Sequence, residues 1–146
     1  EGIQLHPADT GGSFFEMDQM KVDGAENIDG PWWPAGSQWA DFSRTERVRA
    51  ITAAELQAVE PERLAARWAQ IAQIELETDT EGNPTIEFDN ASIRFVEATD
   101  GRGDGLGGID VDCVDRDAVL AGAQQRDCVI NDEQVLLGGL RVYLRG

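Results

Sequence analysis

The feature that most constrains the fold is an order of predicted elements that occurs twice along the chain. Residues 47–98 and residues 105–146 each run through a strand, an acidic residue, a helix and then a pair of strands. The strand-to-helix hinges read VEPERL at 59–64 and VDRDAV at 114–119. A unit of this kind leaves one sheet face without a helix, and two units can bury those faces against each other. The sequence therefore predicts an α+β fold in which a curved sheet surrounds a cleft.

Local patterns support the individual elements. Pro61 fits the first position of a helix, and Leu64 and Trp68 follow it at helical spacing. The segments 85–89 and 92–98 alternate apolar and polar residues, which is typical of a β-hairpin. The second unit repeats this order, with Asp115 as the cap of a helix over residues 116–125 and strands expected at 109–114, 128–130, 134–137 and 140–144.

The first 45 residues lie outside the repeat. Residues 2–5 and 13–17 predict two short strands, separated by a turn that contains Gly-Gly. Residues 21–45 have no sustained period and predict a linker or an ordered loop. Three tryptophans, Trp32, Trp33 and Trp39, lie in this segment. Because tryptophan rings bury large areas, they are expected either to pin the linker against the protein or to line a ligand pocket or a subunit contact.

The charge of the chain limits the classes of partner that it can bind. With 28 acidic against 12 basic residues, the formal net charge is −16. Such a surface is repelled by nucleic acid and by anionic lipid, and no apolar run approaches the roughly 20 residues that span a bilayer. The spacing of Cys113 and Cys128 does not match a metal site. It favours two reduced thiols in a cytoplasmic protein, with a disulfide between them as the alternative.

Three segments resemble the vicinal oxygen chelate superfamily, which includes glyoxalase I, methylmalonyl-CoA epimerase, extradiol dioxygenases and bleomycin-resistance proteins. LHPADTGGSFFEMDQ at 5–19 is similar to a closing strand pair of the family. VEPERLAARW at 59–68 resembles its strand-to-helix entry, and residues 105–127 resemble the start of a second half-domain. The resemblance implies paired βαβββ modules with the helices on the outside of the sheet.

The resemblance also implies a division of the chain. Residues 46–146 resemble one glyoxalase-like domain, built from the half-modules 47–98 and 105–146. Residues 1–20 resemble the closing strand pair of a preceding module that is mostly absent, and 21–45 is then a Trp-rich linker. A tandem-domain protein longer than this chain is expected. Alternatively, the isolated strand pair completes a sheet within this chain or in a partner subunit.

Enzymes of this family use a divalent metal as a Lewis acid, held by His, Gln or Glu side chains on strands that face the cleft. The family's ligand positions fall here at Ala53, at Gly108 or Ile109, and at Tyr143. Ala, Gly and Ile have no donor atom, and a phenol that titrates near 10 is a poor ligand. The resemblance therefore implies that residues 46–146 lack the expected metal ligands.

Glu16 is the exception, because it stands where the family has a glutamate ligand. We predict it as a metal ligand in the intact protein, with companions from the missing preceding module; within this chain only His6 could join it. The residues predicted to line a ligand pocket are His6, Trp32, Trp33, Trp39 and Tyr143.

Two functions remain open at this point. The first is a metal-free domain for small-molecule binding, or for structure and assembly, with no cofactor in this chain. The second is a metal-dependent lyase, isomerase or dioxygenase that acts on a small oxygenated molecule, with Glu16 as one ligand and the divalent metal in the intact protein. No catalytic residue is assigned. A homodimer, or pairing with the missing N-terminal part, is expected for either function.

Overall fold

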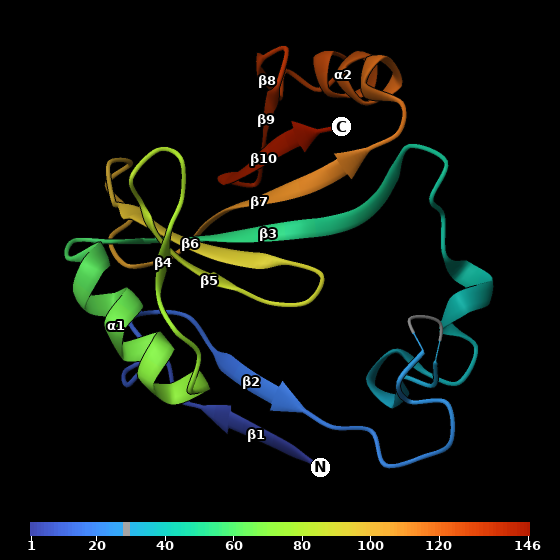
Figure 1. Ribbon diagram of the computed structural model, residues 1–146. Helices are drawn as coiled ribbons and strands as arrows, with labels where there is room; N and C mark the ends of the chain where they lie inside the picture. The colour runs from blue at the N-terminus through green and yellow to red at the C-terminus, as the bar shows by residue number, and fades with distance from the viewer. Residues whose placement is uncertain (28–29) are drawn as a thin grey trace.

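The computed structural model describes residues 1–27 and 30–146 (Figure 1). In this part of the chain, a small sheet, a large mixed sheet and two α-helices confirm the predicted α+β class. The small sheet is an antiparallel pair formed by β1 (Gly2–Leu5) and β2 (Phe15–Asp18). Two short 3₁₀ turns follow, η1 (Trp33–Ala35) and η2 (Trp39–Phe42), in the segment predicted as a linker or ordered loop.

The large sheet is built from two modules with the same order of elements. The first module comprises β3 (Val48–Ala58), α1 (Pro61–Ala72), β4 (Glu77–Thr78), β5 (Pro84–Glu87) and β6 (Ser92–Glu97). The second module comprises β7 (Gly105–Cys113), α2 (Arg116–Gln124), β8 (Val129–Asn131), β9 (Gln134–Leu137) and β10 (Leu140–Arg145). The sequence patterns did not indicate β4, a two-residue strand whose residues are both exposed.

The strand order confirms the predicted pairing of modules. Across the large sheet the order is β4-β5-β6-β3-β7-β10-β9-β8. In each module the first strand therefore lies at the centre of the sheet, the last strand lies beside it, and the second strand lies at the outer edge. The first strands, β3 and β7, pair antiparallel at the centre, and each pairs in parallel with the last strand of its own module. Helices α1 and α2 lie at the periphery, toward opposite ends of the sheet (Figure 1). The fold is therefore a paired βαβββ arrangement.

The register at the centre shows which residues of the two modules are equivalent. Ala54 pairs with Ile109, and on either side Ala53 pairs with Asp110 and Glu55 with Gly108. Glu55 and Asp110 each lie three residues before the last residue of their strand. The approximate twofold relation between the modules thus exchanges Glu55 with Asp110, and Ala53 with Gly108.

Both helices begin where the sequence predicts, for local reasons. Pro61 occupies the first turn of α1, where its missing N–H costs nothing, and Gln73 ends that helix in the left-handed conformation with φ of 57°. The Asp115 carboxylate accepts a hydrogen bond of 3.0 Å from the Ala118 amide and caps α2. Burial of Leu64 and Trp68 then fixes the face that α1 turns to the sheet.

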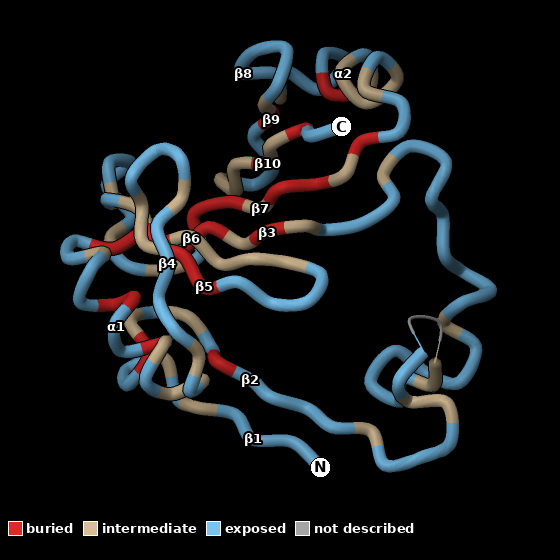
Figure 2. The backbone as a smooth tube through the Cα atoms, viewed as in Figure 1, coloured by how far each residue is buried: buried red, intermediate tan, exposed pale blue. Residues whose placement is uncertain are grey.

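Each module has its own hydrophobic cluster on the helix side of the sheet, and the buried residues follow the central strands and α1 (Figure 2). The first cluster includes Leu56, Trp68 and Phe95, and the second includes Val111 and Leu144. Because side chains alternate along a strand, the neighbouring residues point to the opposite face, which we call the network face.

The N-terminal segment packs against the first module. Phe15 of β2 is buried, with its ring centroid 4.6 Å from that of Trp68 on α1. The Trp68 indole N–H donates a hydrogen bond of 2.9 Å to the Thr10 carbonyl, and Thr10 is itself fully buried. This segment therefore completes the core of the first module. Cys113 and Cys128 are both free thiols in this structure.

Among the described residues, none of the helices is long and apolar enough to cross a membrane.

Candidate functional site

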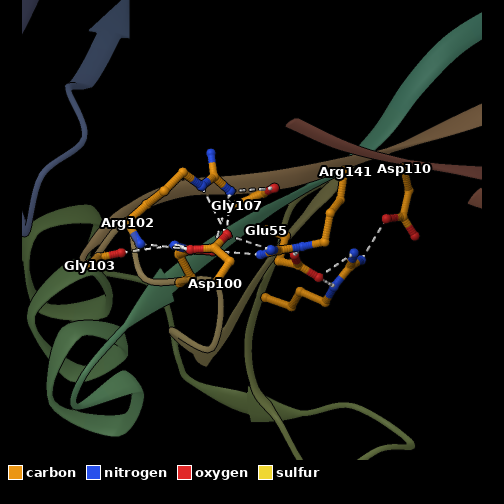
Figure 3. A network of polar contacts seen from close by, with 9 residues as sticks. Glu55, Asp100, Arg102, Gly103, Gly107, Asp110 and Arg141 are labelled. Carbon is orange, nitrogen blue, oxygen red and sulfur yellow. Dashed lines mark hydrogen bonds and ion pairs between the residues drawn. The ribbon is translucent and has the colours of Figure 1, made fainter. Parts of the chain in front are cut away.

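The network face carries a group of buried ion pairs at the junction of the two modules (Figure 3). Glu55 accepts hydrogen bonds from Nε of Arg141 at 2.8 Å and from Nε of Arg94 at 3.0 Å. Asp110 lies 2.7 Å from Nη1 of Arg94 and accepts a 2.8 Å hydrogen bond from Nε of Arg145. The side chains of Glu55, Asp110 and Arg94 are only 5%, 10% and 13% exposed, so these charges depend on one another rather than on water.

The network links the modules in a reciprocal way. Glu55 is held by Arg94 from its own module and by Arg141 from the other. Asp110 is held by Arg145 from its own module and by Arg94 from the other. The pKa of Arg94 is lowered by burial, but the hydrogen bond and charge of Asp110, with those of Glu55, outweigh this and raise it overall. Arg94 therefore stays charged and serves both carboxylates.

The network continues toward the loop between the modules. Arg141 donates from Nη1 to Asp100 at 2.8 Å and from Nη2 to Gln57 at 2.6 Å. Arg102 lies 2.6 Å from Asp100, and its hydrogen bonds are the main cause of a pKa for Asp100 well below the usual range. Gln57, which is buried, also donates to Asp100 at 2.8 Å. The connecting loop is thus tied to strands of both modules.

Tyr143, one of the residues predicted to line a pocket, lies inside this network. Its ring lies close to two guanidinium groups, with Arg94 at 4.7 Å and Arg145 at 5.2 Å from the ring centroid. Burial raises the pKa of Tyr143, and the nearby charge of Glu55 raises it further. The phenol is therefore neutral at physiological pH and acts as a packing surface for the two cations.

The network face does not fit a divalent metal. The equivalent positions Ala53 and Gly108, where the family resemblance places ligands, carry no donor atoms. Two residues further along each strand stand Glu55 and Asp110, but guanidinium groups already hold these carboxylates and would repel a metal cation. Across residues 1–27 and 30–146, no three His, Cys, Asp or Glu side chains gather as a metal site would require.

Glu16 and His6 lie on the N-terminal segment and take no part in this network. Glu16 is exposed on β2 and accepts a 3.0 Å hydrogen bond from the Gln4 amide on β1. Since Phe15 points into the core, alternation places the Glu16 side chain on the other face of the strand. His6 is exposed directly after β1, where its Nδ1 accepts a hydrogen bond from the Ala8 amide at 3.1 Å. That Glu16 binds a metal in the intact protein stays a prediction.

The tryptophans of residues 21–45 lie in a third part of the structure, apart from the network and from Glu16 and His6. Trp32 and Trp39 line a pocket of about 340 Å³ together with Asp18 and Met20, and the Trp39 indole donates to the Gly30 carbonyl at 3.1 Å. Trp33 is 60% exposed. The five candidate pocket residues are therefore distributed over three parts of the structure.

An apolar pocket of about 620 Å³ lies on the helix side of the first module, between β2, α1 and the sheet. Phe15, Leu56 and Trp68 are buried core residues that also line this space. Its full lining is Gly12, Ser13, Phe14, Phe15, Glu16, Met17, Ala54, Leu56, Trp68, Ala72, Ile74, Phe88, Ile93 and Leu106. Sequence reasoning missed this pocket because it joins segments far apart in the chain.

Comparison with known proteins adds little to these observations. No family model matches the chain, and no curated protein matches it. Among solved structures, a selenomethionine crystal structure of methylmalonyl-CoA epimerase is similar to it, with 12% sequence identity and a TM-score of 0.42. The match covers 70% of this chain and 99% of that chain. At this TM-score the likeness supports no conclusion about the present chain.

Proposed function

We propose that this chain is a glyoxalase-like domain that binds a small, mainly apolar molecule without a metal. The observation that carries the proposal is the apolar pocket between β2, α1 and the sheet. Its volume of about 620 Å³ lies within the range of roughly 300–1,000 Å³ that small-molecule sites occupy. Two of the lining residues, Phe15 and Trp68, pack against each other in the buried core, which supports a pocket that is formed before a ligand arrives.

The arrangement of the strands supports the glyoxalase-like part of the proposal. Two βαβββ modules meet through their first strands, which is the architecture of the vicinal oxygen chelate superfamily. The metal-free part is supported by the network face, where Arg94, Arg141 and Arg145 neutralise the carboxylates that a metal would need. The proposed binding therefore uses a different place in the fold from the family's metal chemistry.

Binding of a neutral apolar fluorophore tests the proposal. N-phenyl-1-naphthylamine should become fluorescent with the protein and saturate at one molecule per chain. Ala72→Phe places a ring in the pocket and should weaken this binding at least tenfold. Ala121→Phe is the matched control, because Ala121 is exposed on α2 in the other module. Circular dichroism checks that both variants are folded.

Two outcomes would contradict the proposal. If Ala72→Phe and Ala121→Phe bind the fluorophore as the unchanged chain does, the pocket is not the binding site. Calorimetric titration with Mn²⁺, Co²⁺, Ni²⁺ and Zn²⁺ should show no stoichiometric binding. If one of these ions binds at one per chain and Glu16→Gln abolishes it, the metal-dependent alternative is correct.

A further inference from the structure

Strand β2 presents a free hydrogen-bonding edge beside the apolar pocket. Glu1 and Gln19 exchange two backbone hydrogen bonds, of 2.8 and 2.7 Å, and so form a hydrogen-bonded pair of the antiparallel ladder. Such pairs alternate with pairs whose backbone groups point outward. With Gln4 opposite Glu16 in the register, the N–H and C=O of Glu16 point away from β1.

The pocket lies on this free side of β2. Figure 1 shows β2 between β1 and the large sheet. Within β2, the consecutive residues Phe15, Glu16 and Met17 all line the pocket, and no residue of β1 takes part. A strand that turned one face to a pocket would contribute every second residue, so these three consecutive residues indicate that the strand meets the pocket along its edge. Backbone carbonyl groups are therefore available to a ligand at an otherwise apolar wall.

The charges around the pocket indicate which charge its ligand carries. Among the described residues that line the pocket, Glu16 is the one that carries a charge, and neither Lys nor Arg contributes. The chain as a whole has a formal net charge of −16, which raises the local concentration of cations at its surface and repels anions. A carboxylate or phosphate ligand would meet a negative potential and no cationic partner in this pocket.

We infer that the ligand of this pocket is a lipophilic amine. Its hydrocarbon body fills the space among Leu56, Trp68 and Ile93, and its ammonium group donates to the Glu16 carbonyl at the free edge of β2. Glu16, which also lines the pocket, carries a negative charge that favours a cationic ligand over an anionic one. This inference rests on the proposed function and names the chemical class that the pocket takes.

Competition against N-phenyl-1-naphthylamine tests the inference with three ligands of equal chain length: octylamine, octanol and octanoate, each below its aggregation limit and in 0.15 M salt. Octylamine should displace the fluorophore at a concentration at least tenfold lower than octanol, and octanoate should be the weakest. Glu16→Gln should reduce the advantage of octylamine over octanol at least threefold and leave octanol unchanged. Glu133→Gln, in the exposed β8–β9 turn, is the control and should change neither.

Different results would contradict the inference about amines and the proposed function on which it rests. If octanol displaces the fluorophore as well as octylamine does, or if Glu16→Gln and Glu133→Gln behave alike, the pocket binds apolar molecules without selecting amines and the inference is wrong. If the fluorophore itself does not bind, the proposed function fails, and the inference fails with it.

Discussion

Arg94 of β6 and Asp110 of β7 form an ion pair of 2.7 Å although β3 lies between their strands. Arg94 pairs in register with Glu55, and Asp110 pairs with Ala53. The guanidinium therefore crosses β3 over the stretch between these two residues, where the small side chain of Ala53 leaves room. The family resemblance assigned a metal ligand to the position of Ala53. In this structure, the small side chain at that position leaves space for the Arg94 guanidinium.

Replacing the central arginine should destabilise the chain strongly. Arg94→Met leaves Glu55 and Asp110 buried with one cation fewer, and breaking a buried pair in this way costs about 3–5 kcal/mol. Urea denaturation should show a loss of that size in the free energy of unfolding. Arg63→Met, which breaks an exposed pair with Glu60, should change it by less than about 1 kcal/mol. Equal losses in the two variants would refute the importance of the network.

Two neighbouring phenylalanines should differ in their effect on stability. Phe15 is 6% exposed and packs on Trp68, so Phe15→Ala should cost about 3–5 kcal/mol. Phe14 is 62% exposed, and Phe14→Ala should change the free energy of unfolding by no more than about 0.5 kcal/mol. Hydrogen exchange should also become faster in residues 1–18 of the first variant. Unchanged exchange there would show that the N-terminal segment does not depend on this contact.

Gly107 should not tolerate a side chain. A Cβ atom at this position would clash with Nη2 of Arg141 and would lie 3.0 Å from Oε1 of Gln57. Gly107→Ala should push these groups out of their hydrogen bonds and lower stability by about 1–3 kcal/mol. Gly122→Ala, in α2 with only the Arg126 guanidinium as near as 3.9 Å, should instead stabilise by about 0.5–1 kcal/mol. The same sign for both variants in thermal unfolding would contradict this.

Asp100 should make the stability depend on pH in the acidic range. Its hydrogen bonds with Arg102 hold its pKa in the folded chain well below the unfolded value of about 3.9, so the folded state favours the ionised form. The resulting stability is fully present above that unfolded value and is lost as the pH falls toward the folded pKa. Compared with Asp100→Asn, the unchanged chain should have a higher urea midpoint between pH 5 and 8, and the difference should shrink below pH 4.

An NMR titration of the Asp100 carboxyl group separates this explanation from a general effect of charge. In Arg102→Leu the pKa of Asp100 should rise toward its ordinary value, because the main hydrogen-bond donor is gone. A pKa that does not move in this variant would mean that Arg102 is not its cause.

The sequence predicted the architecture because each local signal agreed with the overall pattern. Hinge residues such as Pro61 and Asp115 act within one turn of chain, and their effects do not depend on distant segments. The order of strands and helices then restricted the sheet to a paired arrangement. The two-residue strand β4 was missed because so short a segment has no periodicity to detect.

The candidate site was less predictable because it depends on register. Glu55, Arg94 and Asp110 each stand in an alternating strand, where a charged residue usually faces solvent. Only the pairing of β3 with β6 and β7 shows that these charges meet. The pocket depends likewise on where β2 lies relative to the sheet, which no motif of residues 1–20 specifies.

The reciprocal arginines have a consequence for folding. Each module has its own hydrophobic cluster and could in that respect fold alone, yet each would then leave its central carboxylate with one of its two cations missing. Partly folded chains with one formed module would carry that electrostatic cost, so they should be sparsely populated. We therefore expect the two halves of this sheet to unfold in a single cooperative transition, and a cut in the loop at 98–104 should yield fragments that acquire structure only when mixed.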